Sequence, residues 1–359
     1  MICSSVNRLG FMSIPLRGDG LYPILEEFSG LRSHVAGKLT VAEAGEQWLK
    51  HAKAGVGRDA PLERATTRGY EDMLNRHIVP MIGRVPLANI NADAVKSFEA
   101  RILEGKRTRA TIKRVLACLV SILADAGAPR NAVRDRPRYK KSGRSNSQLE
   151  VGKDIPTPDE ARSIIHGAAD KWRPILITAI FTGLRASELR GLPWKDVDFP
   201  NGEIHVRQRA DRFYEIGPPK SESSQRSVPM PRYVANTLKE WKLRCPKGEH
   251  DLVFPNGKGK VEDLGNIIHR GLIPAQIASG VIDENGKAKY TGMHCLRHYY
   301  ASWCINRTKD GGLGLPPKNV QARLGHSTLA MTMDTYGHLF KGDDAEEINA
   351  AVDKFMAVS

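Results

Sequence analysis

One stretch near the middle of the chain, residues 128–155, limits what this sequence can fold into more than any other feature. Its apolar residues show neither helical nor strand periodicity, and among its first residues only Asp135 opposes the positive charges. The basic residues gathered there are Arg130, Arg134, Arg136, Arg138, Lys140, Lys141 and Arg144. A segment without a periodic apolar face cannot contribute to a hydrophobic core. We therefore expect a flexible basic linker between two separately folded parts, which suits a chain of 359 residues.

The basic linker has two interpretations. A solvated run of charge is the usual meaning of such a composition. If the parts on either side bind DNA, the same side chains could instead lie along the phosphate backbone. The sequence leaves both interpretations open.

The part before the linker, residues 38–127, is predicted to be a small helical domain. Its apolar residues recur at the three- and four-residue spacing of amphipathic helices. Thr40 and Glu43 have the spacing of a capping box, which marks a helix start. The expected helices begin at about Thr40, Thr66, Asn91 and Thr108.

Two features interrupt this helical pattern. Pro80 lacks a backbone N–H and Gly83 is conformationally free, so the second helix is expected to break after residues 66–77. Residues 1–37 are weakly patterned and contain several glycines. We predict an N-terminal extension there whose fold the sequence does not assign.

The part after the linker, residues 156–343, is expected to be mainly α with a small antiparallel sheet. Thr157 has the character of an N-cap, because a proline and acidic residues follow it. Residues 203–208 and 226–230 predict a pair of strands. Helices are expected near 158–168, 172–182, 231–243, 263–278, 294–308, 317–323 and 328–340. A helical tail is expected over 344–359.

The net charge of the chain indicates the class of molecule that it binds. The formal net charge is +14, which favours a polyanion such as nucleic acid or an anionic membrane surface. No apolar run approaches the roughly 18 residues that span a bilayer, and no basic amphipathic helix suited to a membrane surface is found. The first residues lack the pattern of a signal peptide. Five scattered cysteines without a CxxC pair predict neither a disulfide framework nor a zinc site, and favour a reducing intracellular compartment.

Two arginines have polar partners three residues away. On a helix, Arg185 and Glu188 would share a face, so the carboxylate could orient the guanidinium. His294 and Arg297 have the same spacing. Two fixed guanidiniums can hold a phosphate through bidentate hydrogen bonds. Each pair alone is weak evidence, because surface ion pairs and structural histidines are common.

Tyr336 is the candidate nucleophile beside this phosphate site. It ends a segment in which His326 precedes Ser327, the expected N-cap of the last helix before Tyr336. Attack by a phenol on a phosphodiester builds negative charge that fixed cations stabilise. A phenol with a pKa near ~10 is protonated at neutral pH, so a base or neighbouring cations must help to remove its proton. Taken alone, a tyrosine at this position is more often a packed side chain.

The order of these elements resembles that of the tyrosine recombinase, or phage-type integrase, family. Members carry Arg, Lys, His-x-x-Arg, His and Tyr in this order in their C-terminal domain. The matching segments are TGLRASELRGL at 182–192, PPKSESSQRSVPM at 218–230, MHCLRHYYAS at 293–302 and LGHSTLAMTMDTYGH at 324–338. The resemblance implies a core-binding domain at 38–127 and a catalytic domain at 156–343.

The resemblance also implies a role for each site residue. Arg185 and Arg297 would contact the non-bridging oxygens of the scissile phosphate, and Tyr336 would attack it. Lys220, in a turn between two strands, would protonate the leaving 5′ oxygen. His294 would take part in proton transfer with the tyrosine.

The remaining implied roles complete a site that uses no metal and no cofactor. His326 would hydrogen-bond the phosphate, and Glu188 would brace the pocket. Because a phosphotyrosyl link conserves the bond energy, strands could be resealed without ATP. The sequence contains no paired-carboxylate constellation of the two-metal nuclease kind.

The function implied is that of a site-specific recombinase acting through a 3′-phosphotyrosyl intermediate. The basic linker and the N-terminal extension favour integration or excision of a mobile element. One alternative is a nicking-closing enzyme like the type IB topoisomerases. Another is a non-catalytic DNA-binding regulator on the same fold, which the complete set of catalytic positions disfavours.

The implied partners are double-stranded DNA recombination sites and further copies of the chain. Synapsis would require a homo-tetramer, and directionality factors or DNA-bending proteins could assist. The tail either covers its own core or packs on a neighbouring protomer. A DNA substrate would place the protein in the cytoplasm with the nucleoid, and DNA affinity should fall steeply with salt.

Overall fold

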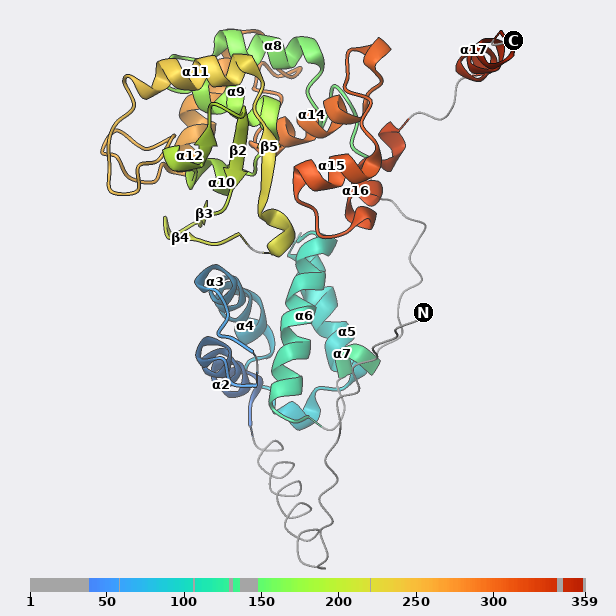
Figure 1. Ribbon diagram of the computed structural model, residues 1–359. Helices are drawn as coiled ribbons and strands as arrows, with labels where there is room; N and C mark the ends of the chain where they lie inside the picture. Colours follow the sequence, from blue (N-terminus) through green and yellow to red (C-terminus); the bar gives the residue numbers. More distant parts are fainter. Residues whose placement is uncertain are drawn as a thin grey trace, which may run out of the picture. The chain divides into compact units, whose positions relative to one another are not determined.

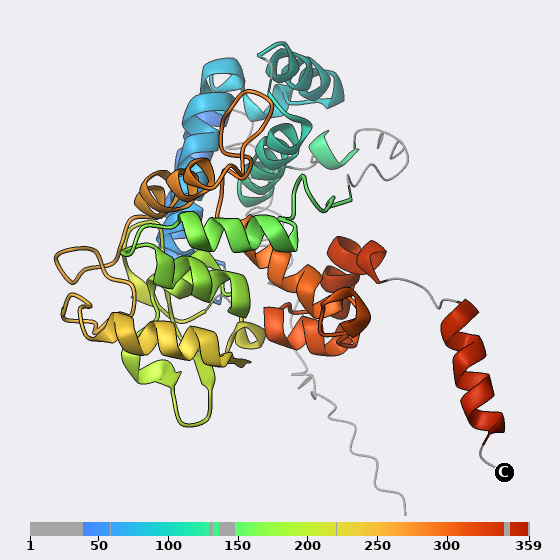
Figure 2. The ribbon, with the colours of Figure 1, turned by 90° about the horizontal axis from the view of Figure 1, so that it is seen from above.

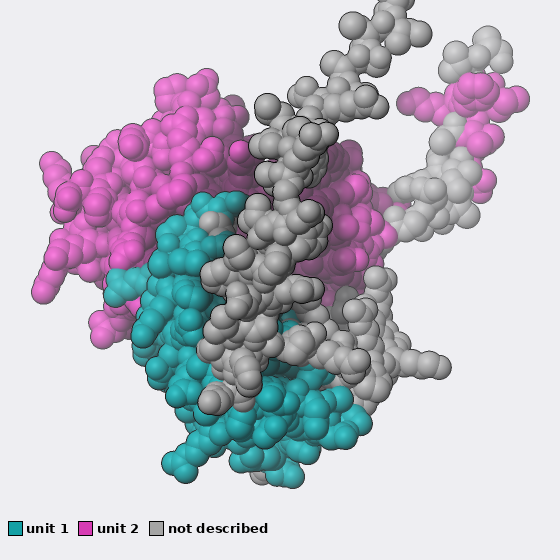
Figure 3. Space-filling view, turned by 90° about the horizontal axis from the view of Figure 1, so that it is seen from below, with its two compact units in different colours: residues 1–140 teal, residues 141–359 magenta. Residues whose placement is uncertain are grey.

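The computed structural model describes residues 39–57, 59–105, 107–128, 132–135, 148–219, 221–340 and 345–357. The chain divides into two compact units between Lys140 and Lys141, which are coloured separately in Figure 3. The predicted extension at 1–37 lies outside the described residues. So do the side chains of all seven predicted linker residues, of which only Arg134 has a described backbone: Arg130, Arg134, Arg136, Arg138, Lys140, Lys141 and Arg144.

The first unit is helical, as predicted (Figure 1). The Thr40 hydroxyl accepts a hydrogen bond from the Glu43 backbone, and the Glu43 carboxylate accepts one from Thr40 N–H, so the expected capping box forms. Its elements are α2 (Val41–Ala54), α3 (Arg64–Met73), a π segment (Leu74–Ile78), α4 (Val79–Ile82), a 3-10 turn (Leu87–Asn89), α5 (Ala92–Glu104), α6 (Arg109–Asp125) and α7 (Ala132–Asp135).

One apolar face of each longer helix builds the core of this unit. Trp48 of α2 packs edge-on against Tyr70 of α3, with ring centroids 4.9 Å apart. The buried side chains that meet there include Trp48, Leu74, Ile78, Phe98, Ile102, Leu119 and Ile122. The burial follows the helical periodicity of the sequence, so the core needs no contribution from the charged faces.

The expected break at Pro80 does not occur. The π segment Leu74–Ile78 joins α3 to α4 without interruption, and the helical path ends only at Gly83. A proline removes one helical hydrogen bond and its ring crowds the preceding turn, whereas the wider π turn leaves room for the ring. A π segment also precedes Pro274: residues Ile267–Leu272 form it and join two short α-helices of the second unit.

The predicted linker is structured at both ends. Helix α7, which contains Arg134, lies within it, and Ala132 and Val133 are buried in the core of the first unit. Ile155, at its other end, is buried in the core of the second unit. The sequence prediction was therefore wrong at these ends, because isolated apolar residues too few to show a period still reach a core.

The second unit is mainly α, as predicted, and contains two small antiparallel sheets where one was expected. Its helices are α8 (Pro158–Gly167), α9 (Arg173–Thr182), α10 (Ala186–Arg190), α11 (Arg232–Lys242), α12 (Leu264–Asn266), α13 (Ile273–Ala278), α14 (His294–Ile305), α15 (Pro317–Leu324), α16 (Leu329–Tyr336) and α17 (Ala345–Met356). Short 3-10 turns lie at Trp194–Asp196, Glu222–Ser224, Thr308–Asp310 and Gly337–Leu339. None of the helices within the described ranges is long and apolar enough to cross a membrane.

The predicted strand pair is present. Strand β2 (Glu203–Val206) pairs antiparallel with β5 (Arg226–Pro229), with Ile204 opposite Val228, and β1 (Val197–Asp198) adds a third strand. A second hairpin, β3 (Arg209–Ala210) with β4 (Ile216–Gly217), was not predicted. Strands of two residues are too short to show an alternating pattern.

Helix α9 lies at the centre of the second unit and is buried on nearly all sides. Helices α8, α11 and α14 pack around it (Figure 2). It ends at Gly183, whose φ of 61° is left-handed and whose position leaves no room for a side chain, because a Cβ there would lie 2.3 Å from the Tyr300 ring. This close approach brings the end of α9 against α14, and so brings the segments that carry Arg185 and Arg297 together.

Candidate active site

Arg185 lies at the N-cap of α10, immediately after the turn at Gly183. Glu188, 3 % exposed, accepts hydrogen bonds from Arg185 N–H at 2.8 Å and from Arg185 Nη1 at 2.7 Å. The carboxylate thus orients the guanidinium, as the three-residue spacing predicted, although Arg185 caps the helix rather than lying within it. The Arg185 side chain remains partly exposed and can meet a ligand.

Glu188 also holds a second guanidinium, which the sequence did not reveal. Arg226 of β5 donates from Nη1 and Nη2 to the two carboxylate oxygens at 3.1 and 2.9 Å, and from Nε to the Arg323 carbonyl at 2.7 Å. Burial favours the neutral carboxyl, but Arg226 and Arg185 outweigh it and hold the pKa of Glu188 below its usual value. No local spacing signals this contact, because the partners are 38 residues apart.

Arg297, on the first turns of α14, is 2 % exposed. It donates from Nη1 to the Gly183 carbonyl at 2.6 Å and from Nη2 to the Leu324 carbonyl. Burial, together with the charge of Arg185, lowers the pKa of Arg297 to about 9, so the group stays charged at neutral pH. Arg185 Nη2 donates to the adjacent carbonyl of Gly325 at 3.0 Å. Two neighbouring carbonyls therefore fix both guanidiniums at one place.

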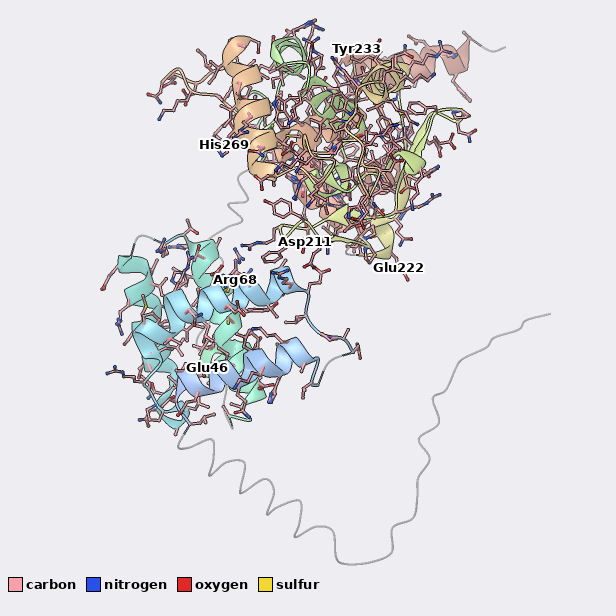
Figure 4. All side chains as sticks on the ribbon, turned by 90° about the vertical axis from the view of Figure 1, so that its left-hand side faces the viewer. Glu46, Arg68, Asp211, Glu222, Tyr233 and His269 are labelled. Carbon is pink, nitrogen blue, oxygen red and sulfur yellow. The ribbon has the colours of Figure 1, made fainter. Side chains whose placement is uncertain are left out.

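A hollow of about 400 Å³ opens beside Arg185. Its lining is mostly polar or small, with Ser187, Ser221, Ser224, Gly325 and Ser327 among the residues. Lys220, the expected general acid, lies outside the described residues, but its neighbours Pro219 and Ser221 line the hollow. Glu222, labelled in Figure 4, belongs to the same short turn.

His326 follows Gly325, which ends α15 in the left-handed conformation at φ 63°. Its Nδ1 lies 2.9 Å from the Thr332 hydroxyl of α16. Burial, with Arg297 and Arg185 nearby, lowers the pKa of His326 to about 4, so the imidazole is neutral. The N-cap of α16 is Thr328 and not Ser327 as predicted, since the Thr328 hydroxyl accepts from Met331 N–H.

Tyr336 ends α16 and is 1 % exposed. Its hydroxyl lies 2.8 Å from Nδ1 of His298, a residue that the sequence prediction did not include. Burial raises the pKa of Tyr336 to about 12, while Arg297 and Arg185 act in the opposite direction. The ring is parallel to that of His326, with centroids 6.3 Å apart.

His298, rather than His294, contacts the phenol. His294 is exposed, and its ring packs edge-on against His298 with centroids 4.5 Å apart. Both histidines come from one face of α14, at the i, i+4 spacing. That spacing was the signal in the sequence that could have revealed His298.

The structure brings together the predicted catalytic and supporting residues that it describes. All lie in the second unit, around the turns that follow α9 and α15. They are Arg185, Glu188, His294, Arg297, His326 and Tyr336. Arg226 and His298 join them.

Comparison with known proteins accounts for this arrangement. Residues 157–342, slightly more than half of the chain, match the model of the phage integrase family. The chain belongs to the phage integrase family. This family match covers every predicted catalytic position from Arg185 to Tyr336.

Two curated relatives of this integrase-family chain share its C-terminal part. A "Tyrosine recombinase XerC-like" protein of Caldanaerobacter subterraneus subsp. tengcongensis is 29% identical over 204 residues, which are 52% of this chain and 50% of that protein. The transposase from transposon Tn916 of Enterococcus faecalis is 31% identical over 177 residues, 45% of this chain and 41% of that one. The chain thus spans about half or less of the length of these relatives.

Solved structures extend the likeness to the whole fold. The integrase of transposon Tn1549, in complex with circular intermediate DNA, has a TM-score of 0.67 at 21% identity, covering 88% of this chain and 100% of that one. A lambda integrase tetramer bound to a Holliday junction has a TM-score of 0.59 at 19% identity, covering 88% and 84%. At these identities the likeness establishes that the chain has the integrase fold.

Proposed function

We propose that this chain is a site-specific tyrosine recombinase that cleaves and rejoins double-stranded DNA through a 3′-phosphotyrosyl intermediate. The observation that carries the proposal is the buried Tyr336 hydroxyl in a site where the adjacent carbonyls of Leu324 and Gly325 fix the guanidiniums of Arg297 and Arg185. A phenol placed beside two fixed cations is suited to attack on a phosphate that those cations hold.

In this mechanism, Arg185 and Arg297 bind the non-bridging oxygens of the scissile phosphate. Tyr336 Oη bonds to phosphorus, the bond to the 5′ oxygen breaks, and Lys220 gives that oxygen a proton. A free 5′ hydroxyl of the same or another strand then reverses the step and releases Tyr336. The guanidiniums contribute most where charge develops, because backbone carbonyls and Glu188 already fix them in place.

The other site residues support this step. His326, neutral and held by Thr332, hydrogen-bonds the phosphate. His294, exposed and packed edge-on against His298, supports proton transfer from the Tyr336 hydroxyl through that neighbouring ring. Glu188 and Arg226 keep Arg185 in place and connect it to β5.

We assign the first unit, at about 38–127, as a core-binding domain, and residues 156–343 as the catalytic domain. The linker residues between them contribute phosphate contacts. Double-stranded recombination sites are the substrate, a homo-tetramer forms the synaptic complex, and the protein works in the cytoplasm at the nucleoid. The transposase and integrase relatives support a mobile element as the DNA that is integrated or excised.

Covalent trapping tests the proposal. Nicked duplexes from the DNA that flanks the gene would be incubated with wild type, Tyr336→Phe and, as a matched control, Tyr233→Phe. Tyr233 is exposed on α11 (Figure 4), so its hydroxyl is dispensable. We expect an SDS-resistant protein–DNA adduct from wild type and Tyr233→Phe, and none from Tyr336→Phe.

The other outcomes discriminate between the remaining functions. An adduct from Tyr336→Phe would mean that another residue is the nucleophile. Tight DNA binding without an adduct from wild type would indicate a non-catalytic regulator. Relaxation of supercoiled DNA without joining of two sites would indicate a nicking-closing enzyme.

A further inference from the structure

The hydrogen bond between α14 and α16 places an unassigned histidine on the reacting atom. His298 Nδ1 lies 2.8 Å from Tyr336 Oη, and the two rings are 5.7 Å apart between centroids. We propose that His298 is the catalytic residue that takes the proton from Tyr336 when the phenol attacks, and returns it when the phosphotyrosyl bond breaks. This proposal rests on the proposed recombinase function and adds the path of the proton to it.

The protonation states fix the direction of this hydrogen bond. Tyr336 keeps its proton at neutral pH, because burial raises its pKa to about 12. Burial, with His294 and Arg297 nearby, lowers the pKa of His298 to about 4, against a smaller opposing effect of Asp154. A neutral imidazole next to a protonated phenol accepts through a bare Nδ1 and carries its own proton on Nε2.

The other two histidines of the site are less well placed for this role. His326 bonds through Nδ1 to Thr332, and its ring lies parallel to Tyr336 at 6.3 Å. His294 is exposed and touches His298 edge-on at 4.5 Å. Among the described residues, His298 is the one that hydrogen-bonds the phenol.

The step balances with the groups already named. The O–H bond of Tyr336 breaks, its electron pair forms the new bond to phosphorus, and the proton passes to His298 Nδ1, which becomes an imidazolium. The bond from phosphorus to the 5′ oxygen breaks with its electron pair, and that oxygen receives a proton from Lys220. A bound phosphate also adds negative charge beside Arg297, which makes His298 a stronger base in the complex than in the free protein.

A hydrogen-bonding role and a proton-accepting role can be separated by substitution. Asparagine at position 298 can accept the same hydrogen bond but cannot take up a proton. Single-turnover cleavage of nicked duplexes would be compared for wild type, His298→Asn and His298→Gln. His166→Asn is the matched control, because His166 is exposed on α8 and takes part in none of the site contacts described above.

We expect both substitutions at position 298 to slow cleavage by about 10²–10⁴-fold, the usual contribution of a general base. DNA affinity should stay within about threefold of wild type, and His166→Asn should cleave at the wild-type rate. Cleavage by His298→Asn within about threefold of wild type would overturn the proposal, because hydrogen bonding alone would then suffice.

The leaving group supplies a second and independent readout. A bridging sulfur at the 5′ position leaves as a thiolate and needs no proton from the enzyme. This substrate should restore cleavage by Lys220→Ala but not by His298→Asn. Restoration of His298→Asn by sulfur would place His298 on the leaving group and overturn the proposal.

Two controls distinguish a loss of proton transfer from a loss of the folded structure and from a failure of the proposed recombinase function. If His298→Asn melts at a lower temperature than wild type, the cleavage assay uses His298→Ala instead, with free imidazole added. A cleavage rate that imidazole restores supports proton transfer by His298. No restoration in a folded His298→Ala protein would count against it. Absence of a wild-type adduct would instead reject the recombinase function itself.

Discussion

At the scale of single residues, Glu188 holds the site together. Its buried carboxylate joins Arg185 and Arg226, and through Arg226 the strand β5. Glu188→Gln would leave two guanidiniums without their counter-charge, and loss of one partner of a buried ion pair costs about 3–5 kcal/mol. We expect a comparable loss in the free energy of unfolding, measured by urea titration, and a large loss of DNA cleavage.

The pH dependence of this loss is predictable. Because the folded-state pKa of Glu188 lies below its ordinary value of 4.5, the stabilisation by its carboxylate is present above that pH and is lost as the pH falls through the folded pKa. The difference in the free energy of unfolding between wild type and Glu188→Gln should therefore become smaller below about pH 4.5. Glu150→Gln, which breaks an exposed pair with Lys153, should change stability by less than about 1 kcal/mol at any pH. A difference in the free energy of unfolding that stayed constant with pH would contradict an ionised Glu188 carboxylate as its cause.

His326 makes a second contribution to the free energy of unfolding that varies with pH. It comes from a base that is neutral in the folded protein, whereas the contribution of Glu188 comes from an ionised acid. Its folded-state pKa of about 4 lies below the ordinary value of 6.5, so the unfolded chain binds more protons between these pH values. The free energy of unfolding should rise from about pH 4 to 6.5, and the rise should be smaller in His326→Asn. Urea titrations at several pH values would measure it, with exposed His166→Asn as the control. An unchanged rise in His326→Asn would show that this imidazole is not held neutral.

Some site residues could be predicted from their spacing along the chain, whereas others could not, because their partners lie far away in the sequence. Arg185 with Glu188, and His294 with Arg297, could be predicted because three residues separate them along the chain. Arg226 could not, because its partner Glu188 lies on a different element and only the fold brings the two together. His298 was missed although its spacing from His294 was visible, because the hydroxyl that it contacts belongs to another helix.

At the scale of elements, the end of α9 is the most sensitive junction. Gly183 has a φ of 61° and no space for a Cβ against Tyr300, while its carbonyl accepts from Arg297. Gly183→Ala adds backbone strain of about 1–2 kcal/mol and an overpacking cost of about 1–3 kcal/mol. We expect a lower melting temperature and slower cleavage, because Arg297 would shift with the turn.

The matched control for this junction is Gly286→Ala. Gly286 has a similar φ of 71°, but nothing lies near the position of its Cβ. Its substitution should cost only the backbone strain and leave the cleavage rate unchanged. Equal effects of the two substitutions would mean that the contact with Tyr300 does not matter.

Element boundaries were predictable where a single residue dictates them. Thr40 forms the expected capping box, and Thr157 is the expected N-cap, which the structure shows to be part of a capping box as well. Pro80 misled the prediction, because a π turn accommodates a proline that would break a regular α-helix. Whether a chain widens its turn or ends its helix depends on packing around that turn, and Leu74 and Ile78 within it are buried.

At the scale of the whole molecule, the net charge of +14 sets the response to salt. If about 6–10 phosphates are contacted, DNA affinity should fall by about 10³–10⁵-fold between 50 and 200 mM salt. Fluorescence anisotropy over a salt series would measure the slope of log K against log salt. A flat dependence would contradict a DNA-binding surface built from lysine and arginine.

The same measurement distinguishes the two interpretations of the linker. Replacing Lys140 and Lys141 by glutamine should reduce the slope by about 2 if both side chains contact phosphates. An unchanged slope would mean a solvated run of charge. The sequence predicted the division of the chain into two parts, because apolar periodicity fails between them, but it could not predict the side-chain contacts of this stretch.

The carbonyls of Leu324 and Gly325 set a limit on changes of chain length. They anchor Arg297 and Arg185, and the same stretch of backbone continues into the helix that ends at Tyr336. One residue inserted within α16 would turn the phenol by about 100° around the helix axis while leaving both anchors in place. The interval from Leu324 to Tyr336 should therefore keep a constant length among functional variants of this chain.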